Sequence, residues 1–397
     1  MKRNLIIGGS LLAILATLAV GQNLLQRTVD AQTNGKMQAP RFEVDPMWPK
    51  PLPNHWLYGN VIGVGVDSRD HIFIIHRGEG NLNPKEIYAT ANPPAADCCN
   101  VAPPVLEFDA EGNLVKAWGG PGPGYDWPGS NHGITPDSKG NLWIGGNGPD
   151  DGHILVFTRE GKFVKQFGFP YASAGSNDMW AFNKVAKVAL DEQANEAYVA
   201  DGYGNHRVAV IDMDTGKIKR YWGAYANKPD DTNLGRYNPS APPAQQFRNP
   251  VHCAIPSNDG LVYVCDRPND RIQVFTKDGK FQKEVFVEKN TLGDGAVWDI
   301  AFSKDPQQTY FYLADGANEK IHIFDRKSLT ELTSFGDGGR YPGAFYAVHS
   351  IATDSKGNIY TTETYEGKRL QKFVYKGLGP VTKKDQGVVW PTKTSTH

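Results

Sequence analysis

The chain has 397 residues and a formal net charge of −1, with 42 lysines and arginines against 43 aspartates and glutamates, which excludes a surface built to hold a nucleic-acid backbone. Its 43 glycines and 27 prolines interrupt the chain too often for long helices, yet they follow no collagen period. A hydrophobic content of 40% excludes a disordered chain, and 11% aromatic residues suit strands and a sizeable core.

Residues 1–31 are typical of a secretory signal peptide. The basic residues Lys2 and Arg3 precede an uncharged apolar run, 5–20, and cleavage fits after Gly21 or after Ala31. The alternative is an uncleaved anchor, although a membrane span normally needs about 20 apolar residues. We therefore expect a secreted or periplasmic protein that has no membrane contact after signal cleavage. Residues 32–50 are then expected to form a linker.

One hairpin pattern recurs along the rest of the chain. A polar turn and an alternating apolar run appear as DSKGNLW at 137–143 and DSKGNIY at 354–360, with a third copy at 67–73. A second hairpin signature follows, as VFTREGKF at 156–163 and VFTKDGKF at 274–281. Two hairpins make four strands, which is the size of one propeller blade.

The repeat predicts an all-β fold, a six-bladed β-propeller over residues 51–378, with a C-terminal tail at 379–397. One twisted sheet cannot bury both of its faces, whereas blades stacked around an axis can. Two β-sandwiches are the alternative, but they do not require the same hairpins six times. The six units start near Gly63, Gly133, Ala186, His252, Trp298 and His349.

Four cysteines in an exported chain can form disulfides. Cys98 and Cys99 are adjacent in a loop rich in proline and alanine, and Cys253 and Cys265 flank a turn so that they can face each other across a hairpin. The sequence leaves the pairing open. Because the chain has no C-x-x-C motif, we do not expect a thiolate zinc site.

Histidine occupies one equivalent position in alternate repeats. His132 and His349 each lie eight residues before the glycine of the polar turn, and His252 lies eight residues before Gly260. This slot falls at the start of the strand that lines the channel of a propeller, and alternate blades of six are related by about 120°. Three imidazoles then converge on the axis, as in a catalytic zinc site with one open position, although Fe, Co, Cu or Ni also suit such ligands. The alternative is three histidines that pack near the channel without a metal.

Arginine and tyrosine share further positions that follow the second strand of each unit. Alignment of the repeats places Arg77 and Arg267 in one slot, and Tyr203 and Tyr365 in the next. Arginine binds carboxylates through two parallel hydrogen bonds, and a tyrosine beside a divalent cation can act as a base. We therefore expect Tyr203, Arg77 and Arg267 to rim the same mouth as the three histidines. Taken singly, an arginine or a tyrosine at the end of a strand is usually only a surface residue or a contact between blades.

From about Gly63 to Phe373 the chain resembles the peptidyl-α-hydroxyglycine α-amidating lyase family, which are six-bladed propellers of NHL-type repeats. The repeat itself is unspecific, whereas three histidines in alternate blades, two arginines and a tyrosine are more specific. The resemblance rests on the segments GVDS at 65–68, HRG at 76–78, HGI at 132–134, ADGYGNHR at 200–207, PVH at 250–252, DRPNDRIQ at 266–273 and VHS at 348–350.

The resemblance implies a role for each matching residue. His132, His252 and His349 would hold Zn²⁺, Tyr203 would be the catalytic base, and Arg77 with Arg267 would bind the substrate. In the family, a peptide ending in α-hydroxyglycine is cleaved at its C–N bond to give a peptide amide and glyoxylate. A metal that polarises the hydroxyl and a base that removes its proton suit this reaction. The expected partner is therefore a small molecule or the C-terminus of a peptide.

The chain also departs from the family pattern. Ser350 stands where the family has a calcium-binding aspartate, which argues against the structural calcium because a hard cation prefers carboxylates. The family's disulfide pattern is absent, and no hydroxylating copper domain is present in this sequence. Other small α-hydroxy or carbinolamide substrates therefore remain open. The sequence does not specify the physiological substrate or the oligomeric state.

Two other functions remain open. The first is a non-enzymatic propeller that binds a protein or a glycan on one face. The second is a metal-dependent hydrolase or lactonase on a similar frame, although such sites typically use carboxylates and calcium, which the histidine slot does not favour.

Overall fold

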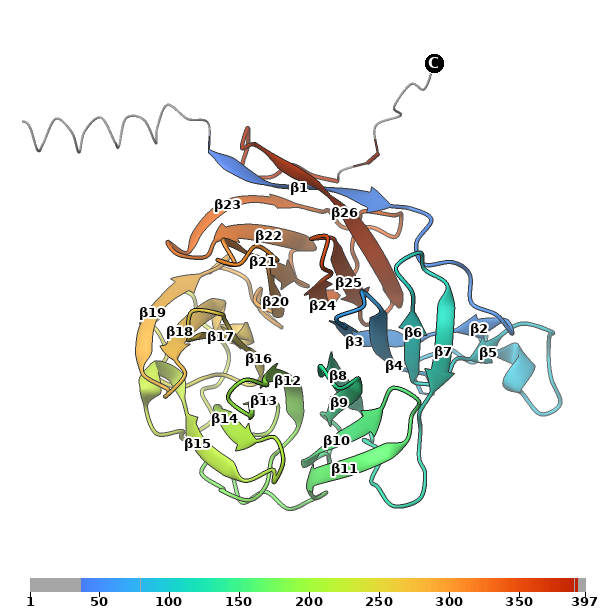
Figure 1. Ribbon diagram of the computed structural model, residues 1–397, viewed down its shortest axis with the longest axis horizontal. Helices are drawn as coiled ribbons and strands as arrows, with labels where there is room; N and C mark the ends of the chain where they lie inside the picture. Colours follow the sequence, from blue (N-terminus) through green and yellow to red (C-terminus); the bar gives the residue numbers. More distant parts are fainter. Residues whose placement is uncertain (1–36, 79, 389, 392–397) are drawn as a thin grey trace, which may run out of the picture.

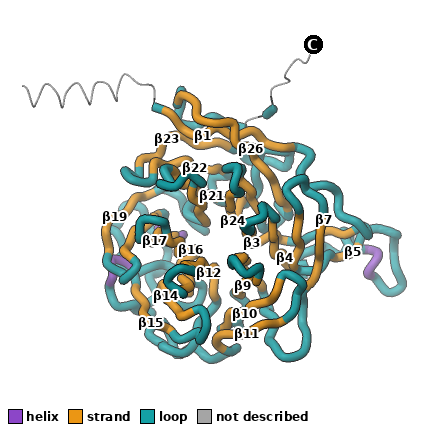
Figure 2. Tube along the Cα trace, viewed as in Figure 1, coloured by secondary structure: helices purple, strands orange, loops and turns teal. Residues whose placement is uncertain are grey.

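Six four-stranded antiparallel sheets surround one axis in the computed structural model, which describes residues 37–78, 80–388 and 390–391 (Figure 1). The predicted six-bladed β-propeller is therefore confirmed. Short 3₁₀ segments are the helical elements of the described residues, and no described helix is long and apolar enough to cross a bilayer (Figure 2). The expected signal peptide, 1–31, lies outside the described residues.

Blades one to five each consist of two consecutive hairpins, as the repeat predicts. The strands of blades one to three, from the axis outward, are β3 (Asn60–Val66), β4 (Ile72–Arg77), β6 (Val105–Phe108) and β7 (Leu114–Trp118); β8 (Asn131–Pro136), β9 (Asn141–Gly146), β10 (His153–Thr158) and β11 (Phe163–Gly168); β12 (Val185–Asp191), β13 (Glu196–Asp201), β14 (Arg207–Asp212) and β15 (Ile218–Trp222). Those of blades four and five are β16 (Val251–Pro256), β17 (Leu261–Asp266), β18 (Arg271–Thr276) and β19 (Phe281–Phe286); β20 (Asp299–Phe302), β21 (Tyr310–Asp315), β22 (Lys320–Asp325) and β23 (Thr330–Phe335).

Blade six is built from both ends of the described chain. Its strands are β24 (Val348–Thr353), β25 (Ile359–Glu363), β26 (Arg369–Pro380) and, outermost, β1 (Gln38–Asp45). Strand β1 pairs antiparallel with β26 from Gln38↔Pro380 to Asp45↔Lys372, and so closes the ring (Figure 1). The propeller therefore begins before residue 51, and the segment expected as a linker, 32–50, contains a strand. The pattern of exposed and buried residues in β1 is too short to show that this strand pairs with β26, which lies more than 320 residues later in the chain.

The hydrophobic core lies between the blades. Six clusters of buried side chains each combine residues from two neighbouring blades; Tyr198 of blade three and Phe275 of blade four share one of them. Neighbouring innermost strands are also in contact around the whole ring. Each fully buried large apolar side chain contributes about 1.5–3 kcal/mol, so a blade owes most of its stability to its neighbours.

Loops and the ends of the chain add to this frame. Cys253 and Cys265 form a disulfide between β16 and β17, as their place in the hairpin suggested, and Cys98 is bonded to Cys99. The short strands β2 (Trp56–Leu57) and β5 (Asn100–Val101) pair in parallel beside blade one. Beyond β26, residues 381–388 of the expected tail lie against blade five, where the amide of Ser334 donates to the carbonyl of Lys384 at 2.8 Å.

Blade five contains a buried histidine that carries a charge at neutral pH. The ring nitrogens of His322 lie 2.9 Å from a carboxylate oxygen of Glu331 and 3.2 Å from one of Asp315. Burial acts to lower the pKa of His322, but the two carboxylates outweigh it and raise the pKa to about 9.

This raised pKa predicts a pH-dependent contribution to folding. The contribution is fully present below pH 6.5 and is lost as the pH rises through 9, because the folded state holds the proton more tightly than the unfolded state. The free energy of unfolding should fall by up to about 3 kcal/mol more in the wild type than in His322→Gln across this window. Urea unfolding at several pH values measures this; parallel profiles for the two proteins would contradict it.

Candidate metal centre

Backbone irregularities turn the histidines toward the channel. The innermost strands of five blades each have a register shift at the slot that holds histidine in alternate repeats, or directly next to it. His252 and His349, for example, are skipped by the pairing of β16 with β17 and of β24 with β25. Because a bulge redirects a side chain, each innermost strand can pack in its sheet and still aim one residue at the axis.

Each histidine is anchored to the blade that follows it. The Nδ1 of His132 lies 2.6 Å from the carbonyl oxygen of Ala186, and the Nδ1 of His349 lies 2.6 Å from that of Ile62. The Nδ1 of His252 makes the same contact with the carbonyl of Trp298. A carbonyl only accepts, so each Nδ1 carries the proton and each Nε2 is left with a free lone pair.

The three acceptors are the residues that fill the same slot in the other three blades. The ring of six slots therefore alternates between a histidine and the carbonyl that orients it. Gly133, which follows His132, has a φ of 45°, and a Cβ there would lie 2.6 Å from the carbonyl oxygen of Ala186. Glycine is therefore required for this close approach.

The histidine side chains form one buried cluster. Ring centroids are 5.1 Å apart for His132 and His252, 4.9 Å for His132 and His349, and 4.8 Å for His252 and His349. Their candidate ligand atoms all lie within 4.8 Å of one another. Three convergent imidazole nitrogens match the donor set that Zn²⁺ takes in sites with an open fourth position.

Electrostatics keep these imidazoles neutral. Burial lowers the pKa of His132, His252 and His349 well below the usual value, and the neighbouring histidines and the charges of Arg77 and Arg267 act in the same direction. A neutral imidazole with a free Nε2 is the form that binds a metal. The residues present therefore fit Zn²⁺ or a similar divalent transition metal.

Tyr203 and Arg267 border this cluster directly. The Tyr203 hydroxyl lies 3.1 Å from the Nε2 atoms of both His132 and His252, and Arg267 Nη1 donates to it at 3.3 Å. The guanidinium of Arg267 also lies over the Trp298 ring, 4.4 Å from its centroid. Its buried Nε has no hydrogen-bond partner among the described residues, which leaves a donor for a ligand.

Unlike Arg267, Arg77 makes its hydrogen bonds to blade two. It ends β4, and its Nε donates to the carbonyl of Asn131 at 3.1 Å while its Nη2 donates to the amide oxygen of Asn147 at 2.6 Å. Blade two therefore holds this side chain of blade one. The second predicted tyrosine, Tyr365, donates its hydroxyl to Asp294 at 2.8 Å.

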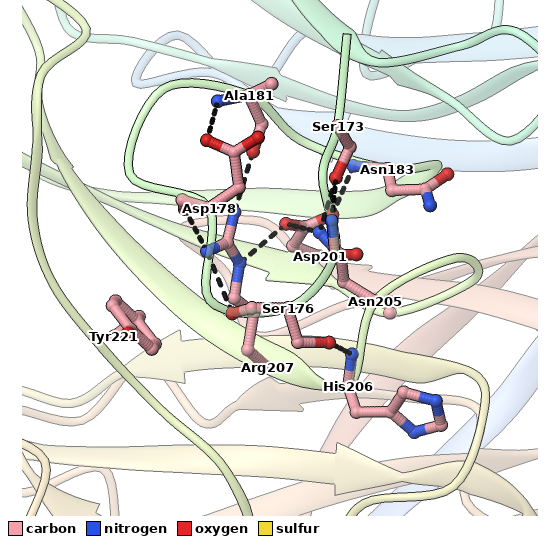
Figure 3. Close-up of polar contacts among 12 residues, drawn as sticks. Ser173, Ser176, Asp178, Ala181, Asn183, Asp201, Asn205, His206, Arg207 and Tyr221 are labelled. Atoms are coloured by element: carbon pink, nitrogen blue, oxygen red, sulfur yellow. Dashed lines mark hydrogen bonds and ion pairs between the residues drawn. The ribbon is translucent and has the colours of Figure 1, made fainter. Parts of the chain in front are cut away.

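A buried ion pair fixes the turn that carries Tyr203. Arg207 and Asp201 are fully buried, and Arg207 Nε donates to the Asp201 carboxylate at 2.8 Å. The other nitrogens of Arg207 reach backbone carbonyls of the loop before β12, among them Ser176 at 3.0 Å and Ala181 at 2.7 Å (Figure 3). Because a buried charge must be paired and hydrogen-bonded, this network leaves the turn little freedom.

The same arrangement recurs at the turns that carry Arg267 and Tyr365. Arg271 donates to Asp266 at 2.7 Å beside Arg267, and Arg369 donates to Glu363 at 2.8 Å beside Tyr365. Each turn thus places a mouth residue one or two positions after a buried acid that is paired with arginine. In each of these turns an acidic residue ends one strand and an arginine five or six residues later begins the next. This spacing is a sequence signal for the turns, and the alignment of the histidines alone does not reveal it.

A lysine occupies the channel next to the histidine layer. Lys187 Nζ lies 2.8 and 2.6 Å from the two carboxylate oxygens of Asp299, and the Ser350 hydroxyl donates to the same carboxylate at 2.7 Å. Lys187 follows Ala186, and Asp299 follows Trp298, so the pair links two of the three anchoring strands. The Lys187 ammonium already neutralises the Asp299 carboxylate, so these residues do not fit a structural calcium ion, which needs carboxylates that are free to bind it.

Comparisons with known proteins agree with the architecture. No family model matches the chain. It is 25% identical over 375 residues to NHL repeat-containing protein 3 of Mus musculus, with 89% of each chain covered, and 23% identical over 354 residues to the Homo sapiens protein of that name, with 84% of each covered. The chain is similar to NHL repeat-containing proteins. The solved structure titled "Streptogramin B lyase structure" matches 85% of this chain and 98% of its own with a TM-score of 0.50 and 12% identity, which shows the fold alone.

A second set of relatives matches only in part. The chain is 26% identical over 242 residues to peptidylglycine alpha-amidating monooxygenase of Rattus norvegicus, which covers 58% of this chain and 22% of that protein. The Mus musculus counterpart is 27% identical over 246 residues with the same coverage. The chain thus spans about a fifth of the length of these relatives, and the similarity to them is distant.

The lysine–aspartate pair leads to a test of the channel. Lys187→Met leaves Asp299, of which 2% is exposed, without its counter-charge, and should lower the free energy of unfolding by about 3 kcal/mol. Lys187→Arg keeps the positive charge and should retain most of the free energy of unfolding that Lys187→Met loses. A calcium chelator should leave the melting temperature of the wild type unchanged. Thermal and urea unfolding measure both effects; a melting temperature that rises with added calcium would contradict this assignment.

Proposed function

We propose that this chain is an exported, metal-dependent carbon–nitrogen lyase that cleaves a carbinolamide into an amide and glyoxylate. The observation that carries the proposal is the Tyr203 hydroxyl, 3.1 Å from two of three convergent histidine nitrogens and within 3.3 Å of Arg267. The partial similarity to peptidylglycine alpha-amidating monooxygenases supports this reaction class. Zn²⁺ is the ion that we expect at His132, His252 and His349.

The positive groups at the mouth suit an α-hydroxy acid. Arg267 keeps an unused buried Nε, and Arg77 comes from the opposite side of the ring, so the two can orient a carboxylate between them. The Trp298 ring under Arg267 limits where this guanidinium can move. The α-hydroxyl of such a substrate is then directed toward Tyr203 and the histidines.

The reaction needs one proton to move from oxygen to nitrogen. Tyr203, acting as its phenolate, takes the proton of the hydroxyl while a carbonyl forms at that carbon and the C–N bond breaks, and it returns this proton to the leaving nitrogen. The nitrogen leaves with a proton as the amide, so that an N-acyl-α-hydroxyglycine gives an amide and glyoxylate with no other reactant. A bound metal would supply Lewis acidity at the hydroxyl. Arg77 and Arg267 hold the carboxylate of the glyoxylate half throughout.

A non-enzymatic binding propeller is the second candidate. The match to NHL repeat-containing protein 3 covers 89% of the chain, and one loop exposes large apolar side chains that could contact a protein or a glycan. They are Phe169, Tyr171 and Trp180, which are 69%, 79% and 84% exposed. Such a role needs no transition metal, so metal content separates the two candidates.

Replacement of the proposed base tests the reaction. Tyr203→Phe should release glyoxylate from α-hydroxyhippurate at least about a hundredfold more slowly than the wild type, because the phenyl ring keeps the packing but cannot take a proton. Its zinc content should not change. The control Tyr341→Phe alters an exposed tyrosine in the loop after blade five and should retain full activity.

Two outcomes would contradict the proposal. Equal rates for Tyr203→Phe and the wild type would remove the base. No glyoxylate from the wild type with any divalent metal would leave the fold as the only shared feature.

A further inference from the structure

A cavity of about 630 Å³ opens between blades three and four beside the candidate metal centre. Arg267 and Asn249 belong to its wall. Arg267 donates to Tyr203, and the Asn249 amide donates to the carbonyls of Gly202 and Asn205 on either side of Tyr203, at 2.8 and 3.0 Å. The cavity therefore shares Arg267 with the site, and its size suits a small ligand group.

The charge of the cavity is positive. Its charged lining residues are Arg236, Arg248, Arg267 and Asp294, together with the titratable His206. Arg248 is engaged, because it donates to Asn269 at 3.0 Å and to the carbonyl of Leu234 at 3.2 Å. The one carboxylate, Asp294, accepts from Tyr365 at 2.8 Å and lies 3.5 Å from Arg267.

Arg236 differs from these residues. Among the described residues it has no ion-pair or hydrogen-bond partner, so its whole guanidinium is available to a ligand. The side chains of Leu234, Tyr237 and Leu292 contribute apolar surface to the same cavity. A guanidinium fork matches a carboxylate through two hydrogen bonds, and the apolar surface suits a short aliphatic chain.

We propose that this cavity binds the acyl half of the substrate and that Arg236 selects acyl groups that end in a second carboxylate. The inference rests on the proposed function, because the acyl half is defined by the C–N bond that breaks at the metal centre. It assigns a substrate class, the ω-carboxyacyl-α-hydroxyglycines. A peptide substrate would meet the same requirement with an acidic side chain next to its hydroxyglycine.

Matched substrates test the selection. Glutaryl-α-hydroxyglycine and pentanoyl-α-hydroxyglycine have acyl chains of equal length, and only the first ends in a carboxylate. The wild type should favour the glutaryl substrate about tenfold in kcat/KM, and Arg236→Gln should reduce this preference to within about twofold while leaving the pentanoyl substrate unchanged. Arg41→Gln, which removes an exposed arginine from the outer strand β1, should keep the preference.

A binding experiment separates this inference from the reaction. Glutaramate, the amide that the glutaryl substrate would release, is titrated into wild-type protein and Arg236→Gln by calorimetry, with pentanamide as the neutral probe. If no hydroxyglycine is cleaved but glutaramate still binds in an Arg236-dependent way, the proposed function fails and the cavity assignment stands. If the wild type shows no preference for the carboxylate, or Arg236→Gln keeps it, the cavity assignment is overturned.

Discussion

The hydrogen bond between a histidine Nδ1 and a carbonyl of the next blade is the contact on which the site depends. It occurs three times, at His132, His252 and His349, and each time it joins one blade to the following one. It sets the tautomer, turns Nε2 to the axis and couples the spacing of the three rings to the closure of the propeller. The geometry of the candidate metal centre is therefore a property of the whole ring, and the pairing of β1 with β26 that closes the ring contributes to it directly.

Around this centre, the protein keeps its charges buried and paired. The ion pair Asp201–Arg207 lies under the turn that carries Tyr203, and the ion pair Asp266–Arg271 lies under the turn that carries Arg267. Tyr203 and Arg267 are hydrogen-bonded to each other beside the histidines. Buried ion pairs of this kind contribute little net stability, but they restrict the turn to one conformation. The residues that fix the turns are therefore different from the residues that can react at the mouth. The loops between blades are not part of these ion pairs, so they can vary and change the cavity beside Arg267.

The features that recur in every repeat could be predicted from the sequence. Equivalent hairpins predicted the six blades, and the histidine slot predicted which three side chains would meet. The sequence was uninformative where partners belong to different repeats. The strand at Gln38–Asp45 has no local mark of its partner, so its sequence reads as a linker. The carbonyls of Ile62, Ala186 and Trp298 could not be predicted because a backbone acceptor leaves no trace in residue type. Lys187 could not be predicted because a lone lysine in a strand is usually exposed, and only the channel brings it to Asp299.

We propose that three histidines from alternate blades, His132, His252 and His349, hold one divalent metal ion. The most direct measurement is the metal content of protein purified without chelators, for the wild type and for His252→Ala, with the exposed His55→Asn as the control. We expect about one tightly bound equivalent of metal in the wild type and the control, and a loss of most of it in His252→Ala. A wild type without a tightly bound transition metal, or a His252→Ala variant that keeps the full equivalent, would contradict it.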